Sequence, residues 1–311
     1  MTTLTDTPGS GLVGAVRAIA SDIKIAHSVF ALPFALLASV MAARPLGGVV
    51  DWSRFAGQAA LVVVAMVCAR SVAMLANRLI DAELDARNPR TAGRAIPSGR
   101  LARRTVSLAI GAFALTFLIV CAGFGVLYGN WWPLVLGGPV LAWISAYGWF
   151  KRFTALCHVY LGSSLAISPI AAALAVNPGG LANQPAVWLI GGMVLCWVAG
   201  FDVIYALQDV DVDRRDGLHS MPSRFGVGAS MWISRGLHVG AVACLALAWR
   251  LDARFGLLFA GGVGLVSVLL VVEHATVARW GTSRIALAFF TLNGVISCVL
   301  GGLGIVDVLV A

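Results

Sequence analysis

Long apolar runs separated by short polar segments dominate this chain. A helix needs about 20 residues to cross a hydrocarbon layer roughly 30 Å thick. The pattern therefore predicts an all-α, polytopic membrane protein with nine transmembrane helices around a central cavity, of which the first is short and tilts or re-enters. The predicted spans lie near residues 27–44, 59–80, 106–127, 132–149, 156–176, 186–208, 232–249, 255–272 and 286–309.

The overall composition supports this fold class. Hydrophobic residues make up 59% of the 311 residues, charged residues only 12%, and the mean hydropathy is +0.90. These values lie far outside the range of soluble globular proteins. No early segment pairs a short apolar core with a small-residue cleavage site, so we expect no removable signal peptide. We expect a single domain, with residues 1–20 as a cytoplasmic tail.

Basic residues are distributed unevenly between the two ends of the predicted spans. Seventeen of the 22 lysines and arginines fall at or beside one end, which we take as the inner side. Arg44, Arg54, Arg250 and Arg254 fall on the outer side, and Arg70 lies inside a span. The positive-inside rule then places the N-terminus and every even-numbered loop in the cytoplasm of a bacterial inner membrane.

Two acidic motifs stand at the inner ends of the second and sixth predicted spans. The first contains Asn77, Asp81 and Asp85, and the second contains Asp209 and Asp213. Residues four apart on a helix share one face. Carboxylates that face one space repel each other, so a cation is expected there, and oxygen ligands favour Mg²⁺ bound together with substrate phosphates. Two solvated helix ends are the simpler alternative, but the shared spacing and sidedness of the motifs favour a site.

A charged residue lies seven positions before each motif, Arg70 in the first half and Asp202 in the second. At 1.5 Å per residue each is about 10 Å deeper in the membrane. Buried charges of this kind are costly, so they are either paired with each other or functional. Each motif is also followed by an arginine-rich loop containing Gly and Pro, which we expect to fold back as a cap.

The remaining composition adds a few restrictions. Six cysteines occur singly and without a CxxC pair, so we interpret them as small packing residues. The net charge of +8 suits anionic membrane lipid and a polyanionic substrate. No nucleic-acid binding is expected, because the chain has no continuous soluble basic face.

Four segments together resemble the UbiA superfamily of intramembrane prenyltransferases. The resemblance covers the chain from about Lys24 to the last span. It rests on a specific combination of motifs: Asn77-x-x-x-Asp81-x-x-x-Asp85, then Arg90-Thr-Ala-Gly-Arg94-Ala-Ile-Pro97-Ser-Gly99, then Lys151-Arg-Phe-Thr154, and Asp202-x-x-Tyr205-Ala-x-x-Asp209-x-x-x-Asp213.

Further segments resemble the bacterial 4-hydroxybenzoate polyprenyltransferase branch, which includes a menaquinone-pathway group. They are Ile23-Lys24-Ile25-Ala-His27-Ser-Val-Phe30, Lys151 to His158, and Gly200 to Asp209. One departure is Arg78, which stands where many members have an aspartate after the first Asn. This leaves the number of metal ions open.

The resemblance implies Mg²⁺-dependent transfer of a polyprenyl group from polyprenyl diphosphate to a hydroxylated aromatic acid in quinone biosynthesis. It implies metal binding by Asn77, Asp81, Asp85, Asp209 and Asp213, with Asp81, Asp209, Lys151 and Tyr205 at the reaction centre. Lys24, Arg94, Lys151 and Arg152 would neutralise the diphosphate, although Lys24, Lys151 and Arg152 also fit a role as topology anchors. Arg70, with Asp202 at the same depth, would hold the polar end of the acceptor.

Three alternatives remain at this stage. Another UbiA-type enzyme would use haem or chlorophyllide as its acceptor. A cation-coupled transporter also uses intramembrane carboxylates, but it would place them near the middle of the membrane. A CDP-alcohol phosphotransferase would need an aspartate motif that this chain lacks. Isolated histidines, namely His27, His158 and His238, are interpreted as packing or interfacial residues, whereas His219, in the loop after the second motif, is the better functional candidate among the histidines.

Overall fold

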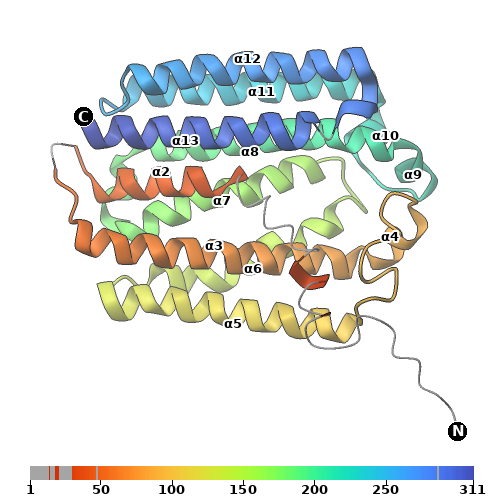
Figure 1. The fold of residues 1–311 in the computed structure, drawn as a ribbon, viewed down its shortest axis with the longest axis horizontal. Helices are drawn as coiled ribbons and strands as arrows, with labels where there is room; N and C mark the ends of the chain where they lie inside the picture. Colours follow the sequence, from red (N-terminus) through yellow and green to blue (C-terminus); the bar gives the residue numbers. More distant parts are fainter. Residues whose placement is uncertain (1–13, 15–17, 21–29, 47, 286) are drawn as a thin grey trace, which may run out of the picture.

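The computed structural model describes residues 14, 18–20, 30–46, 48–285 and 287–311. All regular elements in this part of the chain are helices, and the long ones run along a common direction (Figure 1). The long helices are α3 (Trp52–Ile80), α5 (Arg103–Tyr128), α6 (Trp132–Phe150), α7 (Cys157–Val176), α8 (Pro185–Tyr205), α11 (Val227–Leu251), α12 (Leu257–Trp280) and α13 (Asn293–Val310).

The predicted fold class is confirmed, but the count of nine spans is not. Among the described residues, eight helical segments are long and apolar enough to cross a membrane. The first predicted span corresponds to α2 (Leu32–Ala43), which has 12 residues and is therefore about 18 Å long. Residues 27–29, at the start of that predicted span, lie outside the described part. The structure thus gives eight candidate spans and one short apolar helix.

Several helices extend beyond the predicted apolar runs. α3 begins at Trp52 rather than near residue 59, because Asp51 caps it and accepts a hydrogen bond from the Arg54 backbone N–H. α12 continues from residue 272 to Trp280 and ends before Gly281, whose φ is +57°. Hydropathy detects where a helix is apolar, whereas caps and breakers decide where it ends.

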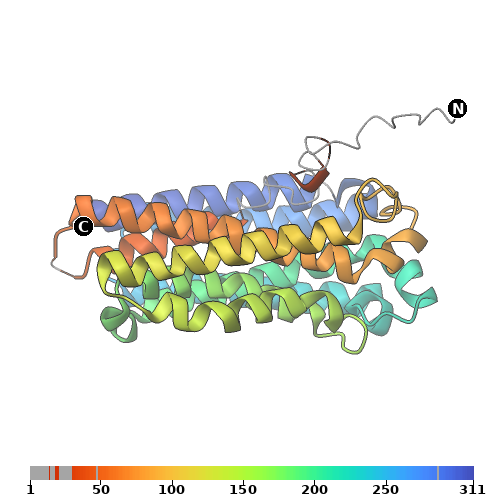
Figure 2. The ribbon, with the colours of Figure 1, turned by 90° about the horizontal axis from the view of Figure 1, so that it is seen from below.

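Short helices gather at one end of the bundle. They are α4 (Ala82–Arg87), the 3₁₀ turn η3 (Ala206–Asp209), α9 (Val210–Arg215) and α10 (Met221–Phe225). Two perpendicular views show α4, α9 and α10 at the same end (Figures 1 and 2). We call this the capped end. Both acidic motifs lie there.

The core of the bundle is built around α8. This helix packs against α7 on one side and α11 on the other, and α2 packs against α7 and α13. Trp197 of α8 is 1% exposed, and its ring makes edge-on contacts with Phe34 and Phe201. α7 and α8 approach closely at Gly162, where an added Cβ would lie 2.3 Å from the Leu195 carbonyl oxygen.

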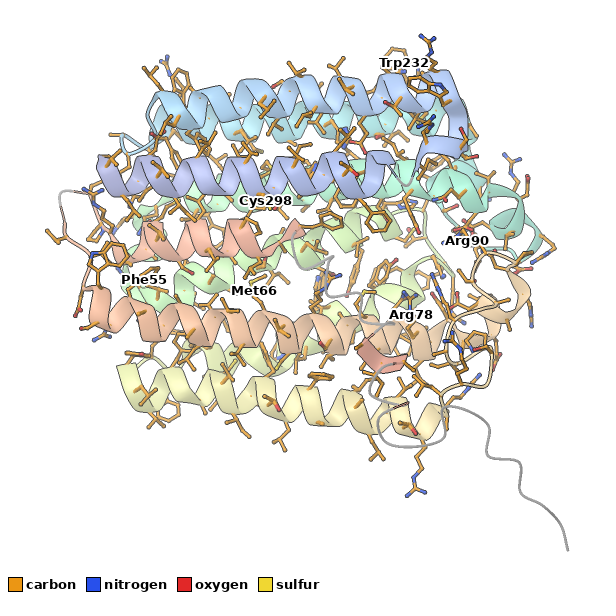
Figure 3. All side chains as sticks on the ribbon, in the orientation of Figure 1. Phe55, Met66, Arg78, Arg90, Trp232 and Cys298 are labelled. Carbon is orange, nitrogen blue, oxygen red and sulfur yellow. The ribbon has the colours of Figure 1, made fainter. Side chains whose placement is uncertain are left out.

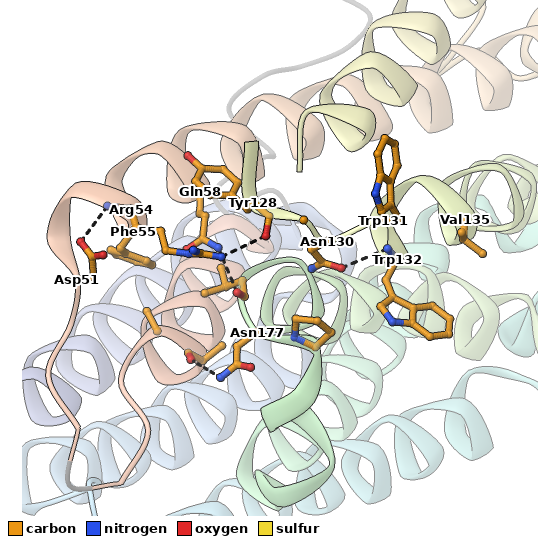
Figure 4. Close-up of a pocket in the computed structure, with 15 residues that line it drawn as sticks. Asp51, Arg54, Phe55, Gln58, Tyr128, Asn130, Trp131, Trp132, Val135 and Asn177 are labelled. Carbon is orange, nitrogen blue, oxygen red and sulfur yellow. Dashed lines mark hydrogen bonds between the residues drawn. The ribbon is translucent and has the colours of Figure 1, made fainter. Parts of the chain in front are cut away.

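At the end opposite the capped end, buried amides satisfy the last carbonyls of α7. The Asn130 Nδ2 donates to Leu174 O at 2.8 Å and to Ala175 O at 2.9 Å, and Gln58 donates to Val176 O at 3.1 Å. These carbonyls have no partner within their own helix. The amides form part of a pocket of about 720 Å³ at this end (Figure 4). Side chains from α3 and from the loop before α6 therefore hold the α7 terminus.

The close approach of α7 and α8 gives a stability test. We expect Gly162→Ala to lower the free energy of unfolding by about 1–3 kcal/mol, because the new methyl group would force the backbones apart. The measurement is thermal unfolding in detergent. Gly236→Ala on the exposed face of α11 is the control, since nothing lies within 4 Å of its added Cβ. Equal melting temperatures for the two variants would contradict the packing described here.

Candidate active site

A cavity of about 710 Å³ opens behind the capped end and continues between the helices. Its walls come from α3, α5, α6, α7 and α8. Polar side chains line the part near the capped end. Phe117, Phe124, Leu136, Leu161 and Ile170 line the deeper, apolar part, which extends as far as Pro133 and Trp188 near the starts of α6 and α8. A ligand with a charged head and a long apolar tail fits this division.

The first acidic motif lies where one helix gives way to the next. A continuous helix through Asn77, Asp81 and Asp85 was predicted, and this is wrong in detail. α3 ends at Ile80, and Asp81 has φ −91° and ψ 2° before α4 begins. This bridge conformation is sparsely populated and recurs at active sites. All three side chains nevertheless line the cavity.

The second motif repeats this geometry. α8 ends at Tyr205, the chain tightens into a 3₁₀ turn, and Asp209 has φ −112° and ψ 7° before α9 begins. Asp209 and Asp213 line the same cavity from the other side. The first aspartate of each motif thus occupies a helix break, and both motifs face one space.

Each buried carboxylate of the first motif has a cationic partner. Asp81 is 2% exposed and accepts a hydrogen bond from Lys151 Nζ at 2.7 Å. The Arg152 guanidinium lies 3.4 Å from the same carboxylate and donates to Ile80 O. Asp85 is 5% exposed and accepts from Arg94 at 2.7 and 2.8 Å. Burial of a carboxylate is stable only with such compensation.

In the second motif, Asp209 is bound by two side chains from the loop that follows the first motif. Arg90 Nε donates to Asp209 Oδ1 at 3.0 Å, and Asn88 Nδ2 donates to the same oxygen at 2.9 Å. Arg90 also donates to the Tyr205 hydroxyl at 3.2 Å. Burial disfavours the guanidinium charge, but the Asp209 carboxylate outweighs this and raises the pKa of Arg90. Arg90, at the capped end in Figure 3, therefore joins the two halves.

Local turns place the loops that follow the two acidic motifs over the site. Pro89 follows Asn88 and restricts it to the extended conformation that ends α4. After α9, Gly217 has φ +68°, Gly217 N–H donates to Arg214 O, and Leu218 N–H donates to Asp213 O. This is a complete Schellman motif, which favours glycine at that position.

Other predicted site residues have different positions. Arg70 and Asp213 line the cavity, and Asp213 is half-buried. Arg152 contacts Asp81 but is not among the cavity-lining residues. Lys24 lies outside the described residues. Glu83 and Asp211, which were expected to point off the site, are exposed.

Asp202 is not paired with Arg70, which removes the first of the two interpretations given for these residues, an ion pair with each other. Asp202 Oδ2 lies 2.7 Å from Nδ1 of His158, and both residues line the cavity. Arg70 Nε is buried and has no hydrogen-bond partner among the described residues. Within the described residues, Arg70 thus keeps one buried and unpaired donor, Nε, in the cavity wall.

The donor set fits a metal that is shared with a ligand. No group of three or more His, Cys, Asp and Glu side chains within the described residues is arranged to hold an ion by itself. Asn77 lines the same cavity as Asp81, and its Oδ1 is buried with no hydrogen-bond partner within the described part of the chain. Mg²⁺ typically takes one or two carboxylates and completes its shell with water and phosphate oxygens. The two motifs match that requirement.

Sequence reasoning overlooked three residues of this site. Arg90 and Asn88 belong to a loop that was expected to cap the site, but nothing in the sequence shows that they reach Asp209. His158 was interpreted as a packing residue, although it contacts Asp202. Its only sequence signal was its position seven residues after Lys151, close to the cytoplasmic motifs.

Comparison with known proteins accounts for this arrangement. The model of the UbiA prenyltransferase family matches residues 31–295. The chain belongs to the UbiA prenyltransferase family. Among UbiA relatives, the 4-hydroxybenzoate octaprenyltransferase of Saccharophagus degradans is 30% identical over 224 residues, which cover 70% of this chain and 68% of the relative. The enzyme of the same name from Nitrosomonas eutropha is 27% identical over 78% of this chain and 81% of its own length.

Solved UbiA structures agree with the fold. The apo structure of a UbiA homolog from Aeropyrum pernix K1 has a TM-score of 0.76 and 27% identity, covering 90% of this chain and 98% of that one. A UbiA homolog from Archaeoglobus fulgidus bound to DMAPP and Mg²⁺ has a TM-score of 0.69 at 16% identity, covering 94% and 99%. This UbiA protein is a multi-pass, all-helical prenyltransferase. Family membership sets aside the transporter and CDP-alcohol phosphotransferase alternatives.

The ion pair between Arg90 and Asp209, which joins the two halves, can be tested without substrate. We expect Arg90→Gln to lower the free energy of unfolding by about 1–2 kcal/mol, because Asp209 would lose its charged partner. Differential scanning fluorimetry of the purified protein measures this. Arg103→Gln is the control, since Arg103 pairs with the exposed Glu83, and surface pairs contribute little. A loss of stability in the control as large as that in Arg90→Gln would contradict a stabilising role for the Arg90–Asp209 ion pair.

Proposed function

We propose that the protein transfers a polyprenyl group from polyprenyl diphosphate to a hydroxylated aromatic acid, with Mg²⁺ as cofactor. The acceptor is of the 4-hydroxybenzoate or dihydroxynaphthoate type, and the product is a quinone precursor. One observation carries the proposal: two acidic motifs, each at a helix break, line the polar end of a single cavity whose remainder is apolar. The 4-hydroxybenzoate octaprenyltransferases among its relatives support it.

The diphosphate would bind at the polar end of the cavity. Lys151, Arg90 and Arg94 now neutralise the motif carboxylates at hydrogen-bond distance. When metal ions neutralise these carboxylates instead, the same cations are free to turn toward phosphate oxygens. Arginine suits this exchange because its planar fork matches both carboxylate and phosphate. The charges at the site are then balanced both with and without bound diphosphate and metal.

The residues that would hold Mg²⁺ divide between the two walls. Asn77, Asp81 and Asp85 form one set, and Asp209 and Asp213 form the other. Bound there, the metal would supply Lewis-acid stabilisation of the charge that develops on the departing diphosphate. Tyr205 lines the cavity one turn before Asp209, so its ring would face the allylic carbon as positive charge develops there.

The prenyl tail would occupy the apolar part of the cavity and remain in contact with lipid. Each CH₂ group kept away from water contributes about 0.8 kcal/mol. A long isoprenoid chain is therefore bound most favourably by a site inside the membrane, where it need not be extracted. Phe117, Phe124 and Leu161 are among the side chains that would contact it.

The acceptor would bind deeper than the diphosphate, between α3 and α8. Arg70, with its free buried Nε, would bind the acceptor carboxylate, and Asp202 would accept a hydrogen bond from its hydroxyl. The donor C–O bond breaks, and diphosphate leaves with the electron pair. A ring carbon of the acceptor forms the new C–C bond, and the proton on that carbon leaves to diphosphate or water, which restores aromaticity.

The distribution of basic residues supports a proposal for the membrane setting. We propose that the chain forms one transmembrane domain in a bacterial cytoplasmic membrane, with the capped end and the N-terminus in the cytoplasm. The capped end carries the arginine-rich loops, as the positive-inside rule requires. Soluble diphosphate product would then leave into the cytoplasm, while the prenylated acceptor stays in the lipid.

Neutralising one carboxylate in either motif tests the metal site. We expect Asp81→Asn and Asp209→Asn to reduce turnover at least 100-fold with the fold retained, because each removes charge that the metal needs. Formation of a lipophilic product from labelled acceptor and prenyl diphosphate is the assay, with Mg²⁺ chelated and restored. Asp211→Asn is the matched control on the exposed side of α9. Full activity of Asp81→Asn or Asp209→Asn at saturating Mg²⁺ would contradict the proposal.

The acceptor site makes a separate prediction. We expect Arg70→Gln to raise the KM for the aromatic acid about ten- to hundredfold, because a charge-assisted hydrogen bond is worth roughly 1.5–3 kcal/mol. The KM for the prenyl diphosphate should stay within about twofold, since Arg70 lies two helical turns from Asn77. Steady-state kinetics with each substrate varied separates these effects. An unchanged acceptor KM would remove Arg70 from the site.

A further inference from the structure

His158 is a buried residue that the reaction outlined above does not use. It stands in the first turn of α7, is 3% exposed and lines the cavity. Both of its ring nitrogens have partners. Nδ1 lies 2.7 Å from Asp202 Oδ2, and Nε2 lies 3.2 Å from the backbone nitrogen of Met221.

The Met221 contact decides which ring nitrogen carries the proton. A backbone N–H can only donate, so Nε2 must accept with its lone pair. The proton of a neutral imidazole is then on Nδ1, which donates to Asp202. If both ring nitrogens carried a proton, the Nε2–H of His158 and the N–H of Met221 would be two donors facing each other at 3.2 Å. The buried N–H of Met221 would then have no acceptor.

Met221 has a structural reason to offer this hydrogen bond. It is the first residue of α10, and the first N–H groups of a helix have no partner within the helix. Ser220, the N-cap, accepts from the Ser223 N–H and leaves the Met221 N–H for His158. The capped end thereby fixes the ring orientation.

We propose that His158 is a positioning residue: as a neutral imidazole with its proton on Nδ1, it holds Asp202 as an anion facing the hydroxyl of the aromatic acceptor. An ionised carboxylate has only acceptor sites, so Asp202 would draw the acceptor hydroxyl toward it and increase electron density at the ring carbon that attacks. This role for Asp202 rests on the proposed function. The tautomer of His158 does not.

The tautomer can be measured directly. The full-length protein is labelled with ¹⁵N-histidine, purified in detergent and studied by NMR at neutral pH, and the His158 signals are assigned as those absent from His158→Asn. We expect one protonated nitrogen and one unprotonated nitrogen, with the proton on Nδ1. Two protonated nitrogens, or a proton on Nε2, would overturn the proposal.

Kinetics tests the positioning role. His158→Asn keeps an N–H group near the position of Nδ1, whereas His158→Leu removes it. We expect kcat to fall about 10- to 100-fold in His158→Leu and less than about threefold in His158→Asn, with the prenyl diphosphate KM unchanged in both. His238→Asn is the control, because His238 is equally buried at 3% but pairs with His274 on α12.

The outcomes separate the two proposals. Equal losses in His158→Leu and His158→Asn would overturn the positioning role, and so would a loss in His238→Asn as large as that in His158→Leu. If the wild-type protein prenylates no hydroxylated aromatic acid, the proposed function fails. The NMR result then still decides the tautomer.

Discussion

Buried carboxylates must be compensated by positive charge, and this constraint organises the capped end. Asp81 and Asp85 are almost completely inaccessible, and Asp209 is half-buried. Moving such a group out of water costs several kcal/mol unless a cation lies nearby. The chain supplies Lys151, Arg94 and Arg90 from loops. These ion pairs tie the loops to both acidic motifs at the polar end of the cavity.

The same charges suit the capped end to the diphosphate site proposed above. A diphosphate with its metal ions brings both signs of charge, so each carboxylate and each cation can exchange its partner without leaving an unpaired buried charge. The two helix breaks contribute to this arrangement. Because the first aspartate of each motif lies in a bridge conformation, the chain turns there and directs both motifs toward one space. The apolar remainder of the cavity suits the prenyl tail of the proposed donor.

Much of the fold and of the candidate site could be predicted from the sequence, because the length of an apolar run and the spacing of repeated carboxylates are local signals. Eight apolar spans and the cavity-lining position of Asn77, Asp81, Asp85, Asp209 and Asp213 fall in this class. Contacts between distant segments could not be predicted. Arg90 and Asp209 are 119 residues apart, and His158 and Asp202 are 44 apart, so only the packing of α7 against α8 and of loop against loop brings them together. The first span was predicted to be short, but its start near residue 27 was not placed correctly: α2 begins at Leu32, and hydropathy does not register where a helix begins.

The central claim is that both acidic motifs bind the diphosphate through divalent metal. Electron–nuclear double resonance tests it most directly. Mn²⁺ replaces Mg²⁺, a non-reactive prenyl diphosphate analogue is bound, and the coupling between manganese and ³¹P is measured. The account predicts a direct ³¹P coupling that disappears when the carboxylates of either motif are neutralised. Manganese that binds without any phosphorus coupling, or a coupling that persists when either motif is neutralised, would contradict it.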